Sequence, residues 1–419
     1  MSTTKSFNIS KQLIWKAYRK VKANKGAAGV DGESIAGFEQ NLKRNLYKVW
    51  NRMSSGSYLP PPVKQVEIPK KTGGTRKLGV PTVSDRIAQM AVKISMEPMI
   101  EPVFHPDSYG YRPKKSAKAA VLITRKRCWQ YDWVVEFDIK GAFDNIDHEL
   151  LMKAVRHHVK ENWMLLYIER WLTAPFEATD GERVKRSRGT PQGGVISPLL
   201  MNLFMHYAFD KWIERSYPHC PFARYADDAV VHCRSQAEAE HLLSTISSRL
   251  RDCLLTIHPD KSKVVYCKDS NRKANYKQTL FTFLGFTFKP RVAVGRQGKK
   301  FTSFLPGVSA EALKEMRRVV KSWNLNRQPY ARLEDLAGKY NAVLRGWWNY
   351  YGSFYKTGMR KLFDYFNQRL VTWARRKYRK LRHRKQRSFE WLSRVMKKQP
   401  MLFHHWQVCR MNDWITGAV

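Results

Sequence analysis

The spacing of apolar residues changes along the chain near residue 290. Before it, short apolar runs bounded by Gly, Pro and Asn alternate with helical stretches, and two strands are predicted over 58–81. After it, apolar residues recur every three or four positions along three predicted helices, the first of which opens at Ser309. This pattern predicts a mixed α+β region up to about residue 290 and a helical region after it. Helices of the first region are predicted over 11–24, 38–53, 83–103 and 117–127.

Two adjacent aspartates, Asp227 and Asp228, interrupt a run from Phe222 to Cys233 that otherwise favours a strand. Neighbouring side chains of a regular strand point to opposite faces, so both carboxylates can share one site only if the backbone turns beside them. A tight hairpin is therefore predicted. Asp-Asp is also a common pair in structural turns. A third carboxylate that meets the pair would therefore favour a functional site over a structural turn.

Asp138 supplies that third carboxylate, since it lies at the end of an apolar strand and is followed by a Gly-Ala turn. Clustered carboxylates repel one another unless a cation neutralises them, and Mg²⁺ suits a few hard oxygen ligands. Two such ions, about 4 Å apart, would activate an attacking 3′-hydroxyl and stabilise a leaving pyrophosphate. This is the chemistry of a nucleotide polymerase.

The charge of the chain indicates a polyanionic partner. Lys and Arg number 76 against 35 Asp and Glu, a formal net charge of +41 in 419 residues. Such a charge repels itself unless nucleic acid is the normal partner, and no lipid-anchor motif favours a membrane. Residues 291–419 alone carry a net charge of +22, and nine of the thirteen residues over 375–387 are basic. We predict nucleic-acid contacts from Arg375, Arg376, Lys377, Arg379, Lys380 and Arg382, the alternative being a solvated helix face.

The cysteine pattern and the N-terminal residues indicate the cellular compartment in which the chain is expected. Six cysteines form no Cys-x-x-Cys pair, so buried free thiols are predicted rather than a zinc site or a disulfide framework. The first residues lack the apolar core of a signal peptide, and the longest apolar stretch is broken by polar residues. A soluble cytoplasmic protein is expected.

Several loops carry residues suited to phosphates or bases, each with a structural alternative. Lys25 lies in a glycine-rich loop that either closes over a phosphate backbone or simply ends a helix. Arg76 follows a Gly-Gly tip and suits a triphosphate, or else is a solvated strand-edge charge. Arg112 either stacks on bases or packs its own loop. Gly193 and Gly194 precede a predicted helix and allow a ligand to approach the backbone closely.

Eight motifs, taken in order, closely resemble those of the reverse transcriptases encoded by bacterial group II introns. The resemblance covers residues 12 to about 290 and continues beyond. The motifs are Asn24-Lys-Gly…Val-Asp-Gly32, Arg76-Lys-Leu-Gly-Val-Pro-Thr82, Tyr109-Gly-Tyr-Arg-Pro113, Phe137-Asp-Ile-Lys-Gly-Ala-Phe-Asp144, Pro191-Gln-Gly-Gly…Ser-Pro-Leu-Leu-Met-Asn202, Tyr225-Ala-Asp-Asp228, His258-Pro-Asp-Lys-Ser262 and Phe283-Leu-Gly-Phe286.

The resemblance implies a metal site and a proton donor. Asp138 and Asp227 would hold two Mg²⁺ ions, with Asp228 beside them and Mn²⁺ as an alternative ion. Lys261 matches a lysine proposed as the general acid for pyrophosphate, although a solvated lysine after an aspartate is also ordinary turn chemistry.

The resemblance also implies the surroundings of the nucleotide. Phe143 matches the steric gate, a ring beneath the sugar that favours deoxynucleotides. Gln192 and the Gly193 backbone would border the incoming nucleotide, and Arg76 would meet its triphosphate. The loop over 24–32, with Lys25, matches the extension that clamps the template.

The implied fold is a right-hand polymerase, with fingers and a palm containing an antiparallel sheet over 1–290, a helical, maturase-specific thumb over 291–375 and a DNA-binding-like tail over 376–419. The implied function is RNA-directed DNA polymerase and maturase, which would assist intron splicing and retrohoming in the bacterial cytosol or nucleoid. The expected partners are group II intron RNA, an RNA template with a DNA primer, target DNA and dNTPs, without a membrane. No Cys/His-rich endonuclease module follows in this sequence, so second-strand cleavage by the chain is not expected.

Two other functions remain open at this point. The chain could be a group II-like transcriptase separated from any intron and serving DNA repair or phage defence. It could also be an RNA-binding splicing factor with little polymerase activity. Asp138, Asp227, Asp228 and Phe143 disfavour the second alternative, because a protein that only binds RNA has no chemical need for clustered carboxylates facing a polyanion.

Overall fold

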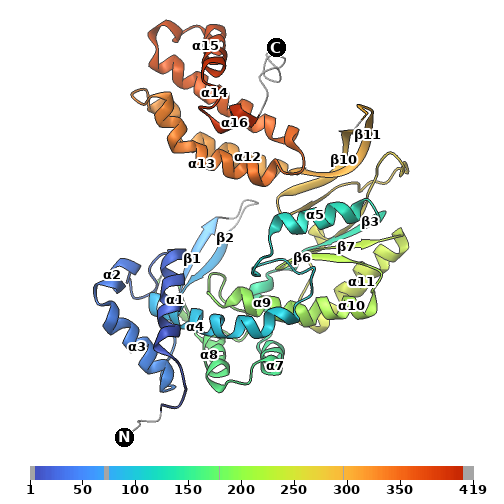
Figure 1. The fold of residues 1–419 in the computed structure, drawn as a ribbon. Coiled ribbons are helices and arrows are strands. Elements are labelled where there is room, and N and C mark those ends of the chain that lie inside the picture. Colours follow the sequence, from blue (N-terminus) through green and yellow to red (C-terminus); the bar gives the residue numbers. More distant parts are fainter. Residues whose placement is uncertain (1–4, 70–74, 179, 296, 409–419) are drawn as a thin grey trace. The chain divides into compact units, whose positions relative to one another are not determined.

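A computed structural model describes residues 5–69, 75–178, 180–295 and 297–408, which form two compact units (Figure 1). The first unit comprises residues 1–120 and 133–264, and the second comprises 121–132 and 265–419. The chain crosses between them within α5 (Ala117–Cys128), before β3 (Trp133–Phe137) and within β8 (Lys263–Tyr266). The functional domains expected over 1–290, 291–375 and 376–419 stay a prediction, because compactness alone does not test them.

The N-terminal part of the first unit is helical and packs around α4 (Val83–Ile100). The predicted helix over 11–24 is confirmed as α1 (Lys11–Asn24), and it buries an apolar stripe against its neighbours. The helix predicted over 38–53 is instead two helices, α2 (Ile35–Gln40) and α3 (Leu42–Ser54). Asn41 separates them with a non-helical backbone, as its side chain favours caps and turns over helix interiors. A 3₁₀ turn over 101–103 extends α4 and completes the helix predicted over 83–103.

The two strands predicted over 58–81 are confirmed as β1 (Val63–Pro69) and β2 (Thr75–Val80), which pair antiparallel. Their predicted Lys-Lys-Thr-Gly-Gly tip, residues 70–74, lies outside the described residues. Two short strands, β4 (Phe176–Glu177) and β5 (Arg183–Val184), extend the sheet in the order β2-β1-β4-β5.

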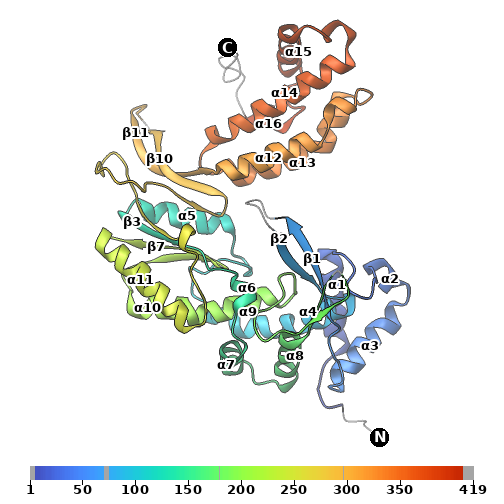
Figure 2. The same cartoon turned by 180° about the vertical axis from the view of Figure 1, so that it is seen from behind.

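A second sheet has the order β6-β7-β3-β8 and carries the predicted carboxylates. β6 (Phe222–Tyr225) and β7 (Asp228–Cys233) form the predicted tight hairpin, and β3 pairs antiparallel with β7. Figures 1 and 2 both show α10 (Lys211–Ser216) and α11 (Gln236–Asp252) on one face of this sheet. The remaining helices of this unit are α6 (Ala142–Asn145), α7 (His148–His158), α8 (Asn162–Thr173), α9 (Ser197–Met205), a π-helix (His206–Asp210) and a 3₁₀ turn (Pro259–Lys261).

The second unit opens with a three-stranded sheet of order β11-β10-β9, formed by β9 (Phe281–Phe283), β10 (Phe286–Val294) and β11 (Lys300–Val308). The sequence analysis missed the β10–β11 hairpin, because Pro290 and Pro306 lower the strand signal on both sides of the turn. The helix predicted to open at Ser309 is confirmed, since the Ser309 side chain caps α12 (Ala310–Ser322).

The helices from α12 onward bury one continuous apolar core. Its members at helical spacing are Leu333, Leu336, Tyr340 and Leu344, then Leu362, Phe366, Leu370 and Trp373. The α+β class is thus confirmed, with a helical C-terminal region. The helices are α13 (Leu333–Tyr351), α14 (Arg360–Lys377), α15 (Lys385–Lys398) and α16 (His404–Val408), with short 3₁₀ turns over 325–327, 356–359 and 379–381. The rest of the expected tail, residues 409–419, lies outside the described residues.

The five cysteines within the described residues are free and buried, as predicted, and Cys409 lies outside them. Across the same described ranges, the helices include none with the length and hydropathy that a membrane span requires.

Candidate active site and nucleic-acid surface

The β6–β7 hairpin brings both predicted aspartates to one end of its sheet. Tyr225 pairs with Asp228, so the turn consists of Ala226 and Asp227 alone. Ala226 adopts a left-handed backbone (φ 59°), a conformation that costs an alanine about 1 kcal/mol and persists only where its surroundings enforce it. Gly110 is part of those surroundings, because a Cβ there would lie 2.4 Å from the Ala226 nitrogen. The turn is therefore held in place by close backbone packing.

Asp138 comes directly after β3, beside the segment that contains Lys261. The backbone of His258 donates to the carbonyl of Asp138 at 2.7 Å, and the Ser262 hydroxyl accepts from the Asp138 backbone at 3.4 Å. These contacts bring the Lys261 ammonium to 2.6 Å from a carboxylate oxygen of Asp138. The structure thus joins two predicted site residues that are 123 positions apart in the chain.

Burial, together with repulsion from neighbouring carboxylates, raises the pKa of Asp227 and of Asp228. Crowding by protein, then the charges of Asp227, Asp138 and Glu136, raise the pKa of Asp228 to about 7, while Lys261 opposes the shift. The Asp228 residue is exposed to solvent, and the neighbouring carboxylates of Asp227 and Asp138 repel its charged form. Burial and the charge of Asp138 also raise the pKa of Asp227. These aspartates therefore form one negative cluster, and the Lys261 ammonium contacts it through Asp138.

Arg224 supports the turn that carries Asp227, a role that was not predicted from the sequence. Its guanidinium forms a bidentate pair with Asp210 at 2.6 and 2.7 Å, and both side chains are fully buried. It also donates to Asn202, to the Ser108 hydroxyl and to the Ala226 carbonyl. All five of its N–H donors are thereby used. The sequence signal was an arginine within an apolar strand, two positions before the turn.

A cleft of about 980 Å³ in the first unit opens beside Asp138 and Asp227, and its lining also includes Lys261, Arg76 and Gln192. Its five named residues were predicted from five separate motifs.

Arg76 and Gln192 are coupled through their side chains. The Arg76 guanidinium donates to the Gln192 side-chain oxygen at 2.5 Å, and the Gln192 amide donates to Asp144 at 3.3 Å. The loop around Gln192 is fixed from α4, where the buried Gln89 accepts from the backbone of Val195 at 2.8 Å. The structure thus presents an arginine fork and an amide at the cleft, joined by a hydrogen bond.

Gly193 and Phe143 have different placements. Gly193 has a φ of 120°, and a Cβ there would meet the Gly79 carbonyl oxygen at 2.4 Å, so close packing of the loop on β2 requires glycine. Phe143, in α6, is 8% exposed and is not among the residues lining the cleft, whereas its neighbours Ala142 and Asp144 are.

The two remaining loop residues differ in availability. Lys25 is exposed, and the backbone of its loop is fixed by Arg86, which donates to the carbonyls of Lys25 and Ala27. Arg112, by contrast, donates to Glu101 and to the carbonyls of His105 and Ser108, and its side chain is 6% exposed. These contacts favour the alternative in which Arg112 packs its own loop, and the nucleic-acid surface proposed below does not include it.

The predicted basic run over 375–387 covers the end of α14 and the start of α15. Lys377 donates to the carbonyls of Pro329 and Ala331, so it anchors a loop, and Arg375 donates to the Arg382 carbonyl at 3.3 Å. The exposed cations of the run are Arg376, Arg379, Lys380 and Arg382 together with Arg384, Lys385 and Arg387.

Comparison with known proteins agrees with this geometry. A family described as reverse transcriptase (RNA-dependent DNA polymerase) matches residues 68–288, and one described as group II intron, maturase-specific domain matches residues 313–391. The group II intron-encoded protein LtrA of Lactococcus lactis is 36% identical over 204 residues, which cover 48% of this chain and 33% of that protein. The protein YkfC of Escherichia coli is 32% identical over 299 residues, covering 62% of this chain and 78% of that protein.

A solved structure of telomerase from Candida albicans aligns over 92% of this chain and 69% of that chain, with a TM-score of 0.47 and 12% identity. The chain spans about a third of the length of LtrA. The reverse transcriptase match covers more than half of the chain and includes all three clustered aspartates. The chain therefore belongs to the reverse transcriptase family and also carries the maturase-specific domain of group II introns.

Proposed function

We propose that this chain is an RNA-directed DNA polymerase that adds deoxynucleotides to a primer 3′-hydroxyl on an RNA template, with release of pyrophosphate. One observation carries the proposal: Asp138, Asp227 and Asp228 share one end of a sheet, beside a cleft lined by an arginine and an amide. Family membership supports the same activity.

The donor set fits two divalent cations. Burial and the charge of Asp138 raise the pKa of Asp227 and of Asp228, so added positive charge would stabilise both carboxylates, and hard oxygen ligands suit Mg²⁺, with Mn²⁺ as an alternative. Asp138 and Asp227 would hold the ions, with Asp228 beside them. Bound there, the two ions would lower the charge barrier for attack by the 3′-hydroxyl and for departure of pyrophosphate.

The other cleft residues would bind and orient the dNTP. Arg76 would donate a guanidinium fork to the triphosphate, held in direction by Gln192. Gln192 and the Gly193 backbone would border the base and sugar, and Phe143 would limit the space at the 2′ position from its place in α6. Lys261, within reach of the same cluster, would give a proton to the departing pyrophosphate.

We further propose a maturase role for the second unit, with group II intron RNA as the partner. The matched maturase-specific domain and the exposed cations of the 375–387 run support it, since phosphate contacts release counterions and favour a structured polyanion. Lys25 would contact the template. Target DNA and retrohoming follow as expectations from the same family, and the cytoplasmic location stays a prediction.

Primer extension tests the polymerase assignment. The wild-type chain should extend a DNA primer on an RNA template with dNTPs and Mg²⁺. The Asp227→Ala, Asp228→Ala double variant should bind the same duplex and the RNA flanking its own reading frame, yet should not extend. Asp252→Asn, which alters an exposed aspartate at the end of α11, is the matched control. Undiminished extension by the double variant would show that the metal site is misassigned. Tight RNA binding without extension by either protein would favour a splicing factor.

A further inference from the structure

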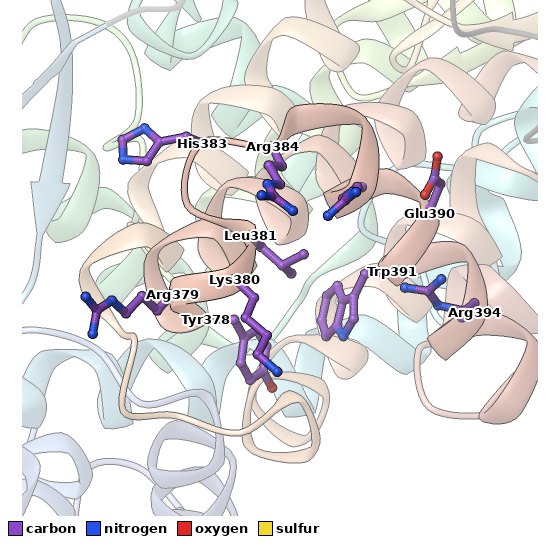
Figure 3. Close-up of a pocket in the computed structure, with 10 residues that line it drawn as sticks. Tyr378, Arg379, Lys380, Leu381, His383, Arg384, Glu390, Trp391 and Arg394 are labelled. Carbon is purple, nitrogen blue, oxygen red and sulfur yellow. The ribbon is translucent and has the colours of Figure 1, made fainter.

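A cavity of about 1030 Å³ lies within the second unit, where α14 ends and α15 begins (Figure 3). Pockets for small organic ligands usually enclose about 300–1,000 Å³, so the space accommodates a group the size of a nucleotide with its flanking phosphates. Its aromatic lining comes from Tyr378 and Trp391, and its cationic lining includes Lys380, Arg384, Arg387 and Arg394.

The two rings are held rigidly and remain accessible. Their centroids are 5.3 Å apart with planes inclined at 53°, and each also packs against the buried Trp373. Tyr378 is 38% exposed and Trp391 is partly buried. The turn between the helices is fixed by Ser388, which is fully buried and donates to the Arg384 carbonyl at 2.7 Å. The aromatic surface is therefore preorganised and needs little ordering on binding.

Within the described part of the chain, the cations around the rings form no ion pair. They are Lys380, Arg384, Arg387 and Arg394, and all four are exposed. Glu390 is the one acidic residue in the lining. Figure 3 shows the Arg394 side chain pointing toward the Trp391 indole and the Lys380 side chain extending in the same direction as Tyr378, whereas Arg379 and His383 extend away from both rings.

We propose that this cavity holds an unpaired nucleotide of a single strand, with its base against Trp391 and Tyr378 and its phosphates on Lys380, Arg384 and Arg387. Phosphate contacts alone would need only the cations. The partly exposed rings add a surface on which a base can stack, and the bases of a duplex are already stacked on one another. The inference deepens the proposed nucleic-acid role of this unit and rests on it.

Removing the base while keeping the phosphates tests this directly. Binding is measured by fluorescence anisotropy with a 12-nucleotide RNA and with the same RNA carrying four central abasic positions. Stacking on an aromatic side chain is expected to make the intact RNA bind about 5- to 100-fold more tightly to the wild type. Trp391→Leu should weaken binding of the intact RNA by a comparable factor and leave binding of the abasic RNA unchanged. Trp391→Phe should restore most of the difference in affinity between the two RNAs. If Trp391→Leu weakens binding of both RNAs equally, or of neither, the proposal is overturned.

Matched variants separate charge from stacking. Arg387→Gln should weaken binding of the intact and the abasic RNA alike, because it removes a phosphate contact. Lys397→Gln, which removes an exposed charge from the same helix outside the cavity, should leave the base-dependent difference intact. DNA oligonucleotides of the same sequence form a second arm. A base-dependent effect in either arm supports the cavity as a nucleotide site and identifies which strand occupies it.

A cross-linking readout covers the case in which Trp391→Leu does not fold. Wild-type protein irradiated with 5-iodouridine RNA should carry the adduct on Tyr378 or Trp391, and adducts confined to other residues would overturn the proposal. Primer extension is measured on the same preparations. If extension persists but the base-dependent difference does not involve Trp391, only this inference fails. If extension is lost with Asp227 intact, the proposed polymerase function fails instead.

Discussion

The Lys261 ammonium lies 2.6 Å from a carboxylate oxygen of Asp138, in direct contact with a proposed metal ligand. Lys261→Met should therefore slow nucleotide incorporation at saturating dNTP by about 100-fold or more, the usual scale for a lost general acid. Lys261→Arg keeps the charge but cannot readily give up a proton, so it should restore dNTP binding without restoring the rate. Rapid-quench single-nucleotide incorporation measures both.

Lys211→Met controls for the loss of one exposed, ion-paired lysine. Lys211 forms an ion pair with Glu214, with 3.2 Å between the ammonium and the carboxylate oxygen, and neither residue belongs to the proposed site. Incorporation by Lys261→Met at the wild-type rate would remove Lys261 from the mechanism and leave it as turn chemistry.

Arg224 and Asp210 should separate stability from positioning. Arg224→Met leaves Asp210 buried without its partner and should lower the free energy of unfolding by about 3–5 kcal/mol. Adding Asp210→Leu should recover most of that stability, because a buried ion pair is commonly replaceable by apolar side chains. The double variant should nevertheless remain slow, since nothing then holds the Ala226 carbonyl. Urea unfolding and incorporation rates are compared; full recovery of the rate would show that the pair serves stability alone.

Gly193→Ala should disturb the dNTP pocket. Its Cβ would lie 2.4 Å from the Gly79 carbonyl oxygen, and its φ of 120° suits glycine. The Gln192 loop must therefore shift, and we expect the KM for dNTP to rise several-fold. Gly338→Ala is the matched control, because a Cβ at this position in α13 would meet nothing within 4 Å. Alanine favours a helix interior over glycine, so this substitution should raise the free energy of unfolding by about 0.5–1 kcal/mol without changing KM. A Gly193→Ala enzyme with unchanged KM would contradict the proposed role of this loop.

Two buried histidines should make stability depend on pH. Burial lowers the pKa of His206 to about 4 and that of His405 to about 3. Their ordinary pKa in the unfolded chain is about 6.5, so between pH 6.5 and 4 the unfolded state binds more protons. Stability is then complete above pH 6.5 and falls as the pH drops, by about 2 kcal/mol per histidine at pH 5. Unfolding curves at several pH values should show this slope, and His405→Gln should reduce it; an unchanged slope would argue against a neutral, buried His405.

Local signals predicted the chemistry, and long-range contacts supplied its support. Asp138, Asp227 and Asp228 were found because each interrupts or ends an apolar strand, a feature visible within ten residues. Arg224 was missed because its partners Asp210, Asn202 and Ser108 lie 14, 22 and 116 positions away, and nothing in the sequence pairs them.

The basic residues show the same limit. Charge density predicted a basic surface over 375–387, but not that Lys377 anchors the loop over 329–331 while Arg376 stays exposed. Arg112 had two interpretations of equal standing in the sequence, and its contacts with Glu101, His105 and Ser108 favour the structural one. Composition therefore locates a surface, whereas the availability of each side chain depends on its fold.

The most direct test of the account is the rate of single-nucleotide incorporation on an RNA template as a function of Mg²⁺ concentration, for the wild type and Asp227→Asn. The wild-type rate should rise with Mg²⁺ and vanish in EDTA. Asp227→Asn keeps the shape of the side chain but loses its charge, and its rate should be lower by at least about 100-fold at any Mg²⁺ concentration. Equal rates with equal Mg²⁺ dependence, or incorporation that persists in EDTA, would contradict a carboxylate-held metal site at this turn.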